Sequence, residues 1–397
     1  MNRREFLALA PVAAAFAQSP GLRPFTVHIP EQKIRHILSQ VRESRWPQRM
    51  DATDWRYGVS WDYMRALTNY WTTRYDWRKA EKNLNRFPQF VAPVDDLDIH
   101  FYHVRGKGPK PFPLILTHGW PGSVFEFLEV IGPLTDPASH GGRAEDAFDV
   151  VVPSLPGYGF SAKPKRVIGA PTTAGLWHKL MTGVLGYSRY GAQGGDLGSG
   201  ITASLGRQFP AAVAGIHLNG AGAGLAPGAE QTDEDRTWLK ELATFNTNDR
   251  DYLNEQQHKT QTIGFALADN PLGAAAWMTE KLKGWSDSPV TEPVFSMDQM
   301  LTCIMIYLVT DTMDSAFWFY RALQDDRGTA TGKVTVPTAF ASFPREMALL
   351  HPPRSVLERG YNLVQYTQMP RGGHFAALEQ PQLLAEDLRS FFRNLRG

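Results

Sequence analysis

The chain has 397 residues, enough to bury a large core and to form more than one ordinary domain. Its 41 basic and 40 acidic residues nearly cancel, so no general electric field favours nucleic acid or an anionic membrane as a partner. The single cysteine, Cys303, cannot form a disulfide within one chain, and its apolar neighbours indicate a buried small side chain rather than a thiol nucleophile.

The first 17 residues have the composition of an export signal. Arg3 and Arg4 precede an apolar run, and Ala15-Phe16-Ala17 supplies a cleavage site of the A-x-A kind. Twin arginines are typical of Tat signals, and roughly twelve apolar residues are too few to span a bilayer as a permanent helix. We therefore predict a cleaved signal over 1–17, a periplasmic or secreted mature protein, and no integral membrane segment after cleavage.

Residues 18–105 are predicted to form an N-terminal extension that packs on the core and holds no candidate nucleophile. Apolar side chains at helical spacing predict a helix over Glu31–Ser44, and a strand–turn–strand pattern covers Phe90–Val104. His100 and His103 stand three apart in that pattern. They therefore point to opposite faces of a strand and do not make a metal-binding pair.

Strands and helices alternate from residue 106 onward, which is typical of a mostly parallel sheet. The predicted strands are Leu114–Thr117, Asp149–Pro153, Tyr187–Gln193, Ala214–Asn219, Thr335–Ser342 and Tyr361–Gln368. The predicted helices are Ser123–Ile131, Thr173–Leu185, Ser199–Phe209 and Leu383–Leu395. Helix-like segments interrupt this alternation after the fourth strand. We expect an α/β fold whose core comprises 106–220 and 333–397, with a helical lid inserted at 221–332.

The segment Tyr190–Ser199 places Asp196 between Gly194 and Gly198, after a predicted strand. This spacing indicates a G-x-nucleophile-x-G elbow, although a glycine-flanked Asp is also typical of an ordinary Asx turn. A carboxylate at the nucleophile position must attack a carbon electrophile and become an alkyl ester. Strained epoxides and alkyl halides are the electrophiles that suit it. We expect Asp196 at an exposed turn.

Further site residues follow other predicted strands. The amide of Trp120, in the loop after Leu114–Thr117, and the amide of Leu197 are candidate oxyanion-hole donors. His374 follows the last predicted strand, where the general base of such an enzyme lies. Its acid partner is predicted to be Glu346.

Asp311 and Asp314 are rivals for the role of that acid, but they lie in the predicted lid. Along the chain, Asp196, Glu346 and His374 follow the order nucleophile, acid, base that accompanies such an elbow.

These motifs together resemble the microsomal-type epoxide hydrolases over nearly everything after the predicted signal. The segments that carry the resemblance are Glu43–Pro47, Tyr75–Arg78, Asn83–Gln89, His118–Ser123, Gly157–Ser161, Gly194–Gly198, Phe343–Met347 and Gly372–Pro381. The resemblance implies an α/β-hydrolase fold with that family's N-terminal domain, no metal or cofactor, and two lid tyrosines, Tyr252 and Tyr320, that donate to the epoxide oxygen. One departure is Leu197, which stands where the family usually has Trp. A second is the lid segment 308–312, which differs from the family's usual pattern.

The hypothesis is therefore hydrolysis of a small apolar epoxide to a vicinal diol, in a detoxifying role. Asp196 opens the ring, and water activated by His374 hydrolyses the ester. A haloalkane dehalogenase is an alternative, but Leu197 cannot supply the indole N–H that often binds the halide. A non-catalytic binding protein on a hydrolase fold is a second alternative, and a homodimer stays an option.

Overall fold

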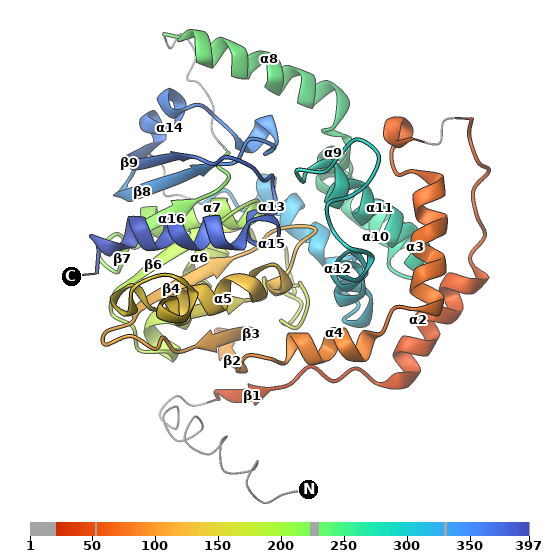
Figure 1. Cartoon of the computed structure of the whole chain (residues 1–397), viewed down its shortest axis with the longest axis horizontal. Helices are drawn as coiled ribbons and strands as arrows, with labels where there is room; N and C mark the ends of the chain where they lie inside the picture. The colour runs from red at the N-terminus through yellow and green to blue at the C-terminus, as the bar shows by residue number, and fades with distance from the viewer. Residues whose placement is uncertain (1–20, 52–53, 223–229, 329–331, 397) are drawn as a thin grey trace, which may run out of the picture.

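The computed structural model describes residues 21–51, 54–222, 230–328 and 332–396 (Figure 1). The predicted signal at 1–17 lies outside the described residues. Within the described ranges, no helix is both long enough and apolar enough to cross a membrane.

A nine-stranded sheet lies at the centre of the described part of the chain, in the order β1-β2-β3-β5-β4-β6-β7-β8-β9. The strands are β1 (Arg23–Phe25), β2 (Gln89–Val94), β3 (Leu97–Val104), β4 (Phe112–Thr117), β5 (Phe148–Pro153), β6 (Tyr190–Gly194), β7 (Val213–Leu218), β8 (Val334–Ser342) and β9 (Tyr361–Gln368). The pairs from β1 to β5 are antiparallel, and those from β5 to β9 are parallel. Strands β5, β6 and β7 are buried along their whole length, as a parallel sheet covered on both faces requires.

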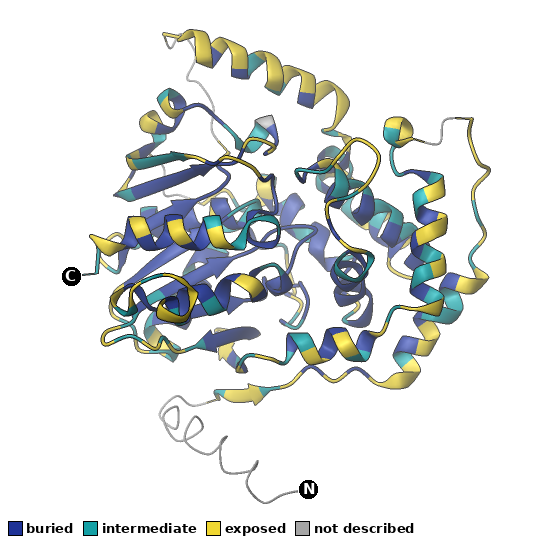
Figure 2. Ribbon diagram, viewed as in Figure 1, coloured by how far each residue is buried: buried dark blue, intermediate teal, exposed yellow. Residues whose placement is uncertain are grey.

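Helices cover both faces of this sheet (Figure 2). One pair, α5 (Leu128–Thr135) and α16 (Pro381–Arg393), packs together in front of the sheet as drawn in Figure 1. The other pair, α6 (Ala170–Lys179) and α7 (Leu197–Gln208), packs together behind it. Two short helices, α14 (Arg354–Gly360) and α15 (Ala376–Glu379), flank the last strand. The carboxyl ends of the parallel strands are left free to carry side chains toward the lid.

The lid helices lie between β7 and β8 in sequence. They are α8 (Asp233–Asn248), α9 (Asp251–His258), α10 (Thr260–Leu267), α11 (Pro271–Gly284), α12 (Met297–Val309) and α13 (Trp318–Asp325). A capping box between Ser296 and Gln299 begins α12, which is then buried from Met300 to its end. A helix that is apolar on every face belongs inside a protein, and Cys303 is buried there as predicted.

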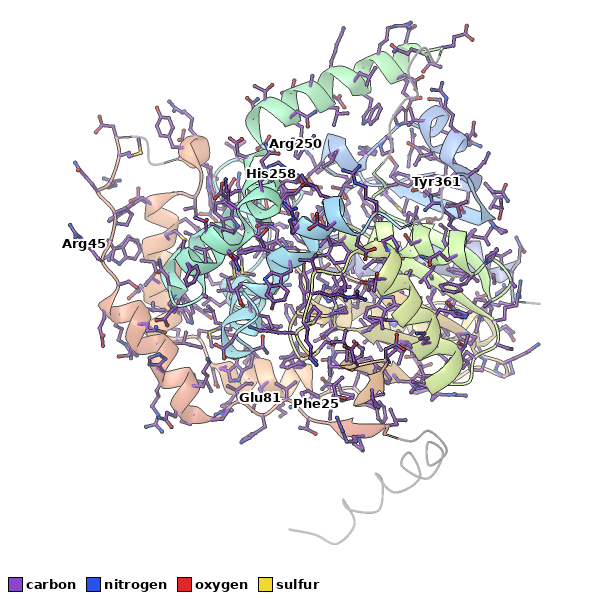
Figure 3. The ribbon with its side chains drawn as sticks, turned by 180° about the vertical axis from the view of Figure 1, so that it is seen from behind. Phe25, Arg45, Glu81, Arg250, His258 and Tyr361 are labelled. Carbon is purple, nitrogen blue, oxygen red and sulfur yellow. The ribbon has the colours of Figure 1, made fainter. Side chains whose placement is uncertain are left out.

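The N-terminal extension joins the sheet to the lid. Its strand β1 pairs with β2, while α2 (Glu31–Glu43) contacts α11 and α12, and α3 (Trp61–Thr73) and α4 (Trp77–Leu84) contact α12. Figure 3 shows Phe25 and Glu81 along the lower edge of the molecule. The Glu81 carboxylate accepts hydrogen bonds from the backbone N–H of Ile29 and from the indole of Trp77. The extension therefore fixes its own turns while it spans both parts.

The structure confirms the six predicted core strands, the helix that begins at Glu31 and the strand–turn–strand, which is β2 and β3. The third core strand begins at Tyr190 rather than Tyr187, because the backbone N–H of Tyr187 still donates to the carbonyl of Met181 in the preceding helical segment. The helix predicted from Ser123 begins instead with a 3₁₀ turn, η2 (Val124–Phe127), where Ser123 accepts from the N–H of Phe125. β1 has only three residues, too few for an alternation signal.

Candidate active site

Asp196 stands at a sharp turn between β6 and α7. Its φ of 49° and ψ of −131° are unusual for a residue with a side chain, and such strain is typical of a nucleophile elbow. The expectation of an exposed turn is wrong, because the Asp196 side chain is only 11% exposed. The surrounding loops and the lid remove this carboxylate from bulk water.

Glycines allow the neighbouring loop to approach this turn. A Cβ on Gly119 would lie 2.0 Å from Oδ1 of Asp196, and a Cβ on Gly198 would lie 2.1 Å from the carbonyl oxygen of Thr117. No side chain fits at either place. The loop after β4 can therefore lie directly against the nucleophile only because these two positions lack a Cβ.

The three residues predicted as nucleophile, acid and base meet at the carboxyl ends of the strands. Nε2 of His374 lies 3.2 Å from Oδ2 of Asp196, and Nδ1 of His374 lies 2.8 Å from Oε1 of Glu346. The side chains of His374 and Glu346 are almost fully buried. Burial alone would lower the pKa of His374, but Glu346 and Asp196 hold it well above its ordinary value. The imidazole therefore lies between two carboxyl groups that favour its charged form.

The two rival acids lie elsewhere. Asp311 pairs with Lys33 of the N-terminal extension, and Asp314 pairs with Lys163. Both aspartates are partly exposed. Of the three candidate acids, Glu346 is the one that contacts His374.

One predicted oxyanion-hole donor already contacts the nucleophile. The backbone N–H of Trp120 donates to Oδ1 of Asp196 at 2.9 Å. Leu197 is the first residue of α7, so its N–H belongs to the first turn of the helix, where backbone donors have no partner within the helix. Oδ1 of Asp196 thus lies where the carbonyl oxygen of an Asp196 ester would gain negative charge.

The lid brings both predicted tyrosines over the elbow. Tyr252 on α9 and Tyr320 on α13 are buried, and their rings lie 6.2 Å apart. The indole of Trp120 lies 5.9 Å from the Tyr252 ring and 6.0 Å from the Tyr320 ring. Burial, together with the charge of Asp196, raises the pKa of both phenols well above the ordinary value of 10. The Tyr320 hydroxyl is buried and has no hydrogen-bond partner in the described part of the chain.

Two cavities meet at Asp196. The larger, of about 350 Å³, lies under the lid and is mainly apolar. Its walls include Ala170, Asp196, Leu197, Ser199, Gly200, Gly222, Arg250, Tyr252, Leu253, Gln257, Phe319, Tyr320, Leu323, Leu349 and Leu350. The smaller has a volume of about 20 Å³. Its walls are Thr117, His118, Gly119, Trp120, Glu126, Phe127, Gly195, Asp196, Asn219, His374, Phe375, Ala376 and Ala377. Asp196 is the one residue common to both sets.

Three residues near the site were not singled out from the sequence. Glu126 follows the Gly119-containing loop, Trp285 packs its ring 5.2 Å from that of His374, and Glu379 accepts hydrogen bonds beside His374. Glu379 lies within the motif Gly372–Pro381, and Glu126 lies three residues after the motif that ends at Ser123. Position in a motif was therefore the available signal for Glu379, whereas Glu126 and Trp285 had none.

In the described part of the chain, no group of three or more His, Cys, Asp or Glu side chains is placed to hold a metal ion.

The chain is similar to epoxide hydrolases along most of its length. A family model described as "Epoxide hydrolase N terminus" matches residues 22–127, and one described as "alpha/beta hydrolase fold" matches residues 113–276. A protein of Stigmatella aurantiaca (strain DW4/3-1) named "Putative epoxide hydrolase" is 43% identical, over 95% of this chain and 86% of that protein. "Epoxide hydrolase 1" of Sus scrofa is 36% identical, over 95% of this chain and 90% of that protein.

The solved structure of the Aspergillus niger epoxide hydrolase superposes with a TM-score of 0.85 at 30% identity, covering 96% of this chain and 99% of that one. The predicted α/β-hydrolase fold is thereby confirmed. Because the sequence matches run through the N-terminal extension as well as the core, the chain belongs to the microsomal-type epoxide hydrolase family.

Proposed function

We propose that this epoxide hydrolase converts a small apolar epoxide into a vicinal diol, with Asp196 as nucleophile, His374 and Glu346 as base and acid, and Tyr252 and Tyr320 as proton donors. One observation carries the proposal. The Asp196 carboxylate lies between the His374–Glu346 pair and a cavity roofed by two buried phenols, one of which has no partner in the described residues.

The first half-reaction takes place in the larger cavity. Oδ2 of Asp196 attacks one ring carbon, the carbon–oxygen bond of the epoxide breaks, and a phenol gives its proton to the leaving oxygen. The products are an alkyl ester on Asp196 and a tyrosinate. An alkoxide is far more basic than a phenolate, so a phenol whose pKa is raised still suits this donation and stays protonated until then.

The second half-reaction releases the diol. His374 takes a proton from water, whose oxygen bonds to Cγ of the ester. The carbonyl oxygen held by the N–H of Trp120 becomes an oxyanion, and such a donor contributes about 3 kcal/mol. The bond from Cγ to the alkyl oxygen then breaks, and that oxygen takes the proton from His374. The Asp196 carboxylic acid then gives its proton to the tyrosinate, which restores the carboxylate and the phenol.

Alkylation also prepares the base. Asp196 and Glu346 together raise the pKa of His374, and esterification removes the charge of Asp196. The imidazole therefore becomes easier to deprotonate at the moment when the reaction needs a base.

The substrate class follows from the walls of the larger cavity. Five leucines and Phe319 line it, with Asp196 and Arg250 as its charged groups, so burial favours an apolar epoxide. Leu197 also faces this cavity, where the family usually has an indole.

A dehalogenase remains the second candidate because the Trp120 indole N–H is buried and has no partner in the described residues, as a halide donor would be. Two phenols at the leaving atom favour the epoxide instead. The decisive assay gives the purified protein styrene oxide in one reaction and a bromoalkane in another, and measures diol and bromide. Bromide release without diol formation would overturn the proposal.

We also propose export through the Tat-like signal, with a detoxifying role outside the cytoplasm. Cleavage after Ala17 would leave β1, which begins at Arg23, in place as the sheet edge. Exchange of Arg3 and Arg4 for lysine should retain the full-length precursor in the cytoplasm, as measured by fractionation and intact mass. The homodimer option is tested separately by light scattering.

A further inference from the structure

Glu126 places a carboxyl group on the wall of the smaller cavity, and no step of the proposed reaction uses it. It lies in η2, which contacts α15, the short helix that begins two residues after His374. The same cavity wall includes Asp196 and His374. Glu126 is therefore a third ionisable group beside the two that act on water.

Gly122 leaves room for the Glu126 carboxyl group. A Cβ on Gly122 would lie 1.3 Å from Oε1 of Glu126, so any side chain at position 122 would displace the carboxyl. Gly122 and Glu126 flank the same turn, which Ser123 caps. The Glu126 carboxyl therefore occupies the space that a side chain at position 122 would fill.

None of the ion pairs among the described residues includes Glu126, although its neighbours Glu129 and His374 both form ion pairs. Burial raises its pKa to about 8, the neighbouring His374 opposes that rise, and Asp196 adds to it. At neutral pH the carboxyl is therefore mostly protonated. A neutral carboxyl can donate one hydrogen bond and accept others without placing a second negative charge beside Asp196.

The smaller cavity has the size and the polarity of a water site. A water molecule needs roughly 10–15 Å³ of space for its centre and two to four polar partners. The cavity offers about 20 Å³, with Glu126, Asp196, Asn219 and His374 on its walls. The larger cavity contains neither Glu126 nor His374 in its wall, so the two reactants approach Asp196 from different sides.

We propose that Glu126 binds the hydrolytic water in the smaller cavity, by a hydrogen bond that orients it between His374 and Cγ of Asp196. This inference rests on the proposed covalent mechanism. Glu126 neither gains nor loses a proton overall: the water proton passes to Nε2 of His374 and the water oxygen bonds to Cγ. Glu126 holds the water oxygen in line for attack on Cγ. Such positioning accelerates a reaction strongly when the reacting atoms would otherwise move freely.

The test separates the two half-reactions in single-turnover experiments with styrene oxide. Glu126→Met keeps the side-chain length but removes every hydrogen bond, whereas Glu126→Gln keeps a donor and an acceptor. Glu129→Gln is the matched control, since Glu129 lies three residues on, is 56% exposed and pairs with Arg86. We expect Glu126→Met to form the Asp196 ester at the wild-type rate and to hydrolyse it at least about tenfold more slowly. Glu126→Gln should recover most of that loss, and the control should show none.

Each outcome has a distinct meaning. Ester hydrolysis at the wild-type rate in Glu126→Met, or equal slowing of both half-reactions in a folded variant, overturns the water-binding role. His374→Gln is run in parallel: if it accumulates an ester and Glu126→Met does not, only the role of Glu126 is wrong. If no ester forms in any variant, the covalent mechanism itself is wrong and the role of Glu126 is overturned with it. Thermal melting of each variant establishes folding, and Glu126→Gln supplies the comparison if Glu126→Met does not fold.

Discussion

The backbone carbonyl of Trp285, just after lid helix α11, accepts a hydrogen bond of 2.9 Å from the backbone N–H of His374. The next lid residue but one, Asp287, donates its N–H to the carboxylate of Glu379, which also accepts from the N–H groups of Gly373 and Phe375. The catalytic base is therefore held on both sides of its backbone and from the lid.

Glu379→Gln should weaken this arrangement. An amide can accept at only one of its two terminal atoms, so at least one backbone N–H loses its partner, at a cost of about 1–3 kcal/mol. We expect a lower melting temperature and slower ester hydrolysis, with ring opening less affected because Asp196 keeps its place. Glu386→Gln, at a 54% exposed position on α16, is the control. Equal loss in both half-reactions would contradict a specific effect on His374.

His374→Gln should stop the reaction after ring opening. Formation of the ester needs the Asp196 carboxylate and the phenols, while its hydrolysis needs a base. Intact-protein mass spectrometry after mixing with excess styrene oxide should show one added substrate mass, on the peptide that contains Asp196. Full loss of turnover without any adduct would mean that His374 acts before ring opening.

Tyr320→Phe should slow ring opening without destabilising the fold. The hydroxyl is buried without a partner in the described residues, so its removal costs no protein hydrogen bond and should leave the melting temperature equal or higher. Loss of one acid should reduce the alkylation rate by about tenfold or more, and Tyr252→Phe should add to it. A double variant that opens styrene oxide at the wild-type single-turnover rate would show that both rings only pack.

Gly119→Ala should displace the nucleophile, because the new methyl group would lie 2.0 Å from Oδ1 of Asp196. We expect ring opening to fall by at least about a hundredfold, which corresponds to roughly 3 kcal/mol. The control is Gly175→Ala in α6, where a Cβ meets nothing within 4 Å and alanine should raise helix stability. Activity retained in Gly119→Ala would contradict the close approach of this loop.

The difference in stability between Glu126→Gln and the wild type should depend on pH. The Glu126 carboxyl has an ordinary pKa of 4.5 and a folded pKa of about 8, so the folded chain binds more protons than the unfolded chain between these values. Its burial therefore costs more stability as pH rises through that range. Between pH 5 and pH 8, the free energy of unfolding of the variant minus that of the wild type should increase by an amount on the order of a few kcal/mol. Urea titrations at each pH measure it. A difference that is constant with pH would contradict the raised pKa.

Much of the fold and of the reacting set could be predicted from the sequence because local patterns determine them. Parallel strands alternate with helices, and a glycine-flanked Asp196 follows one of those strands. The carboxyl ends of parallel strands share one edge of the sheet, so His374 and Glu346 could be placed beside Asp196 from their order alone.

Other features depend on contacts between distant segments and had no local signal. Burial of Asp196 arises from the lid and the loop after β4, which is why an exposed turn was wrongly expected. The role of Trp285 needs the path of the lid over the His374 loop. Glu126 was missed because a lone glutamate after a turn is usually solvated, and only the missing Cβ of Gly122 lets it turn inward.

The size of the smaller cavity has a consequence for chemoselectivity. With about 20 Å³, it has room for a water molecule and is far smaller than the cavity of about 350 Å³ under the lid. From this side, water should therefore reach the Asp196 ester more readily than bulkier solvent nucleophiles do. In mixed solvents the enzyme should therefore favour the free diol over a glycol monoether, and the ratio of these two products measures that preference.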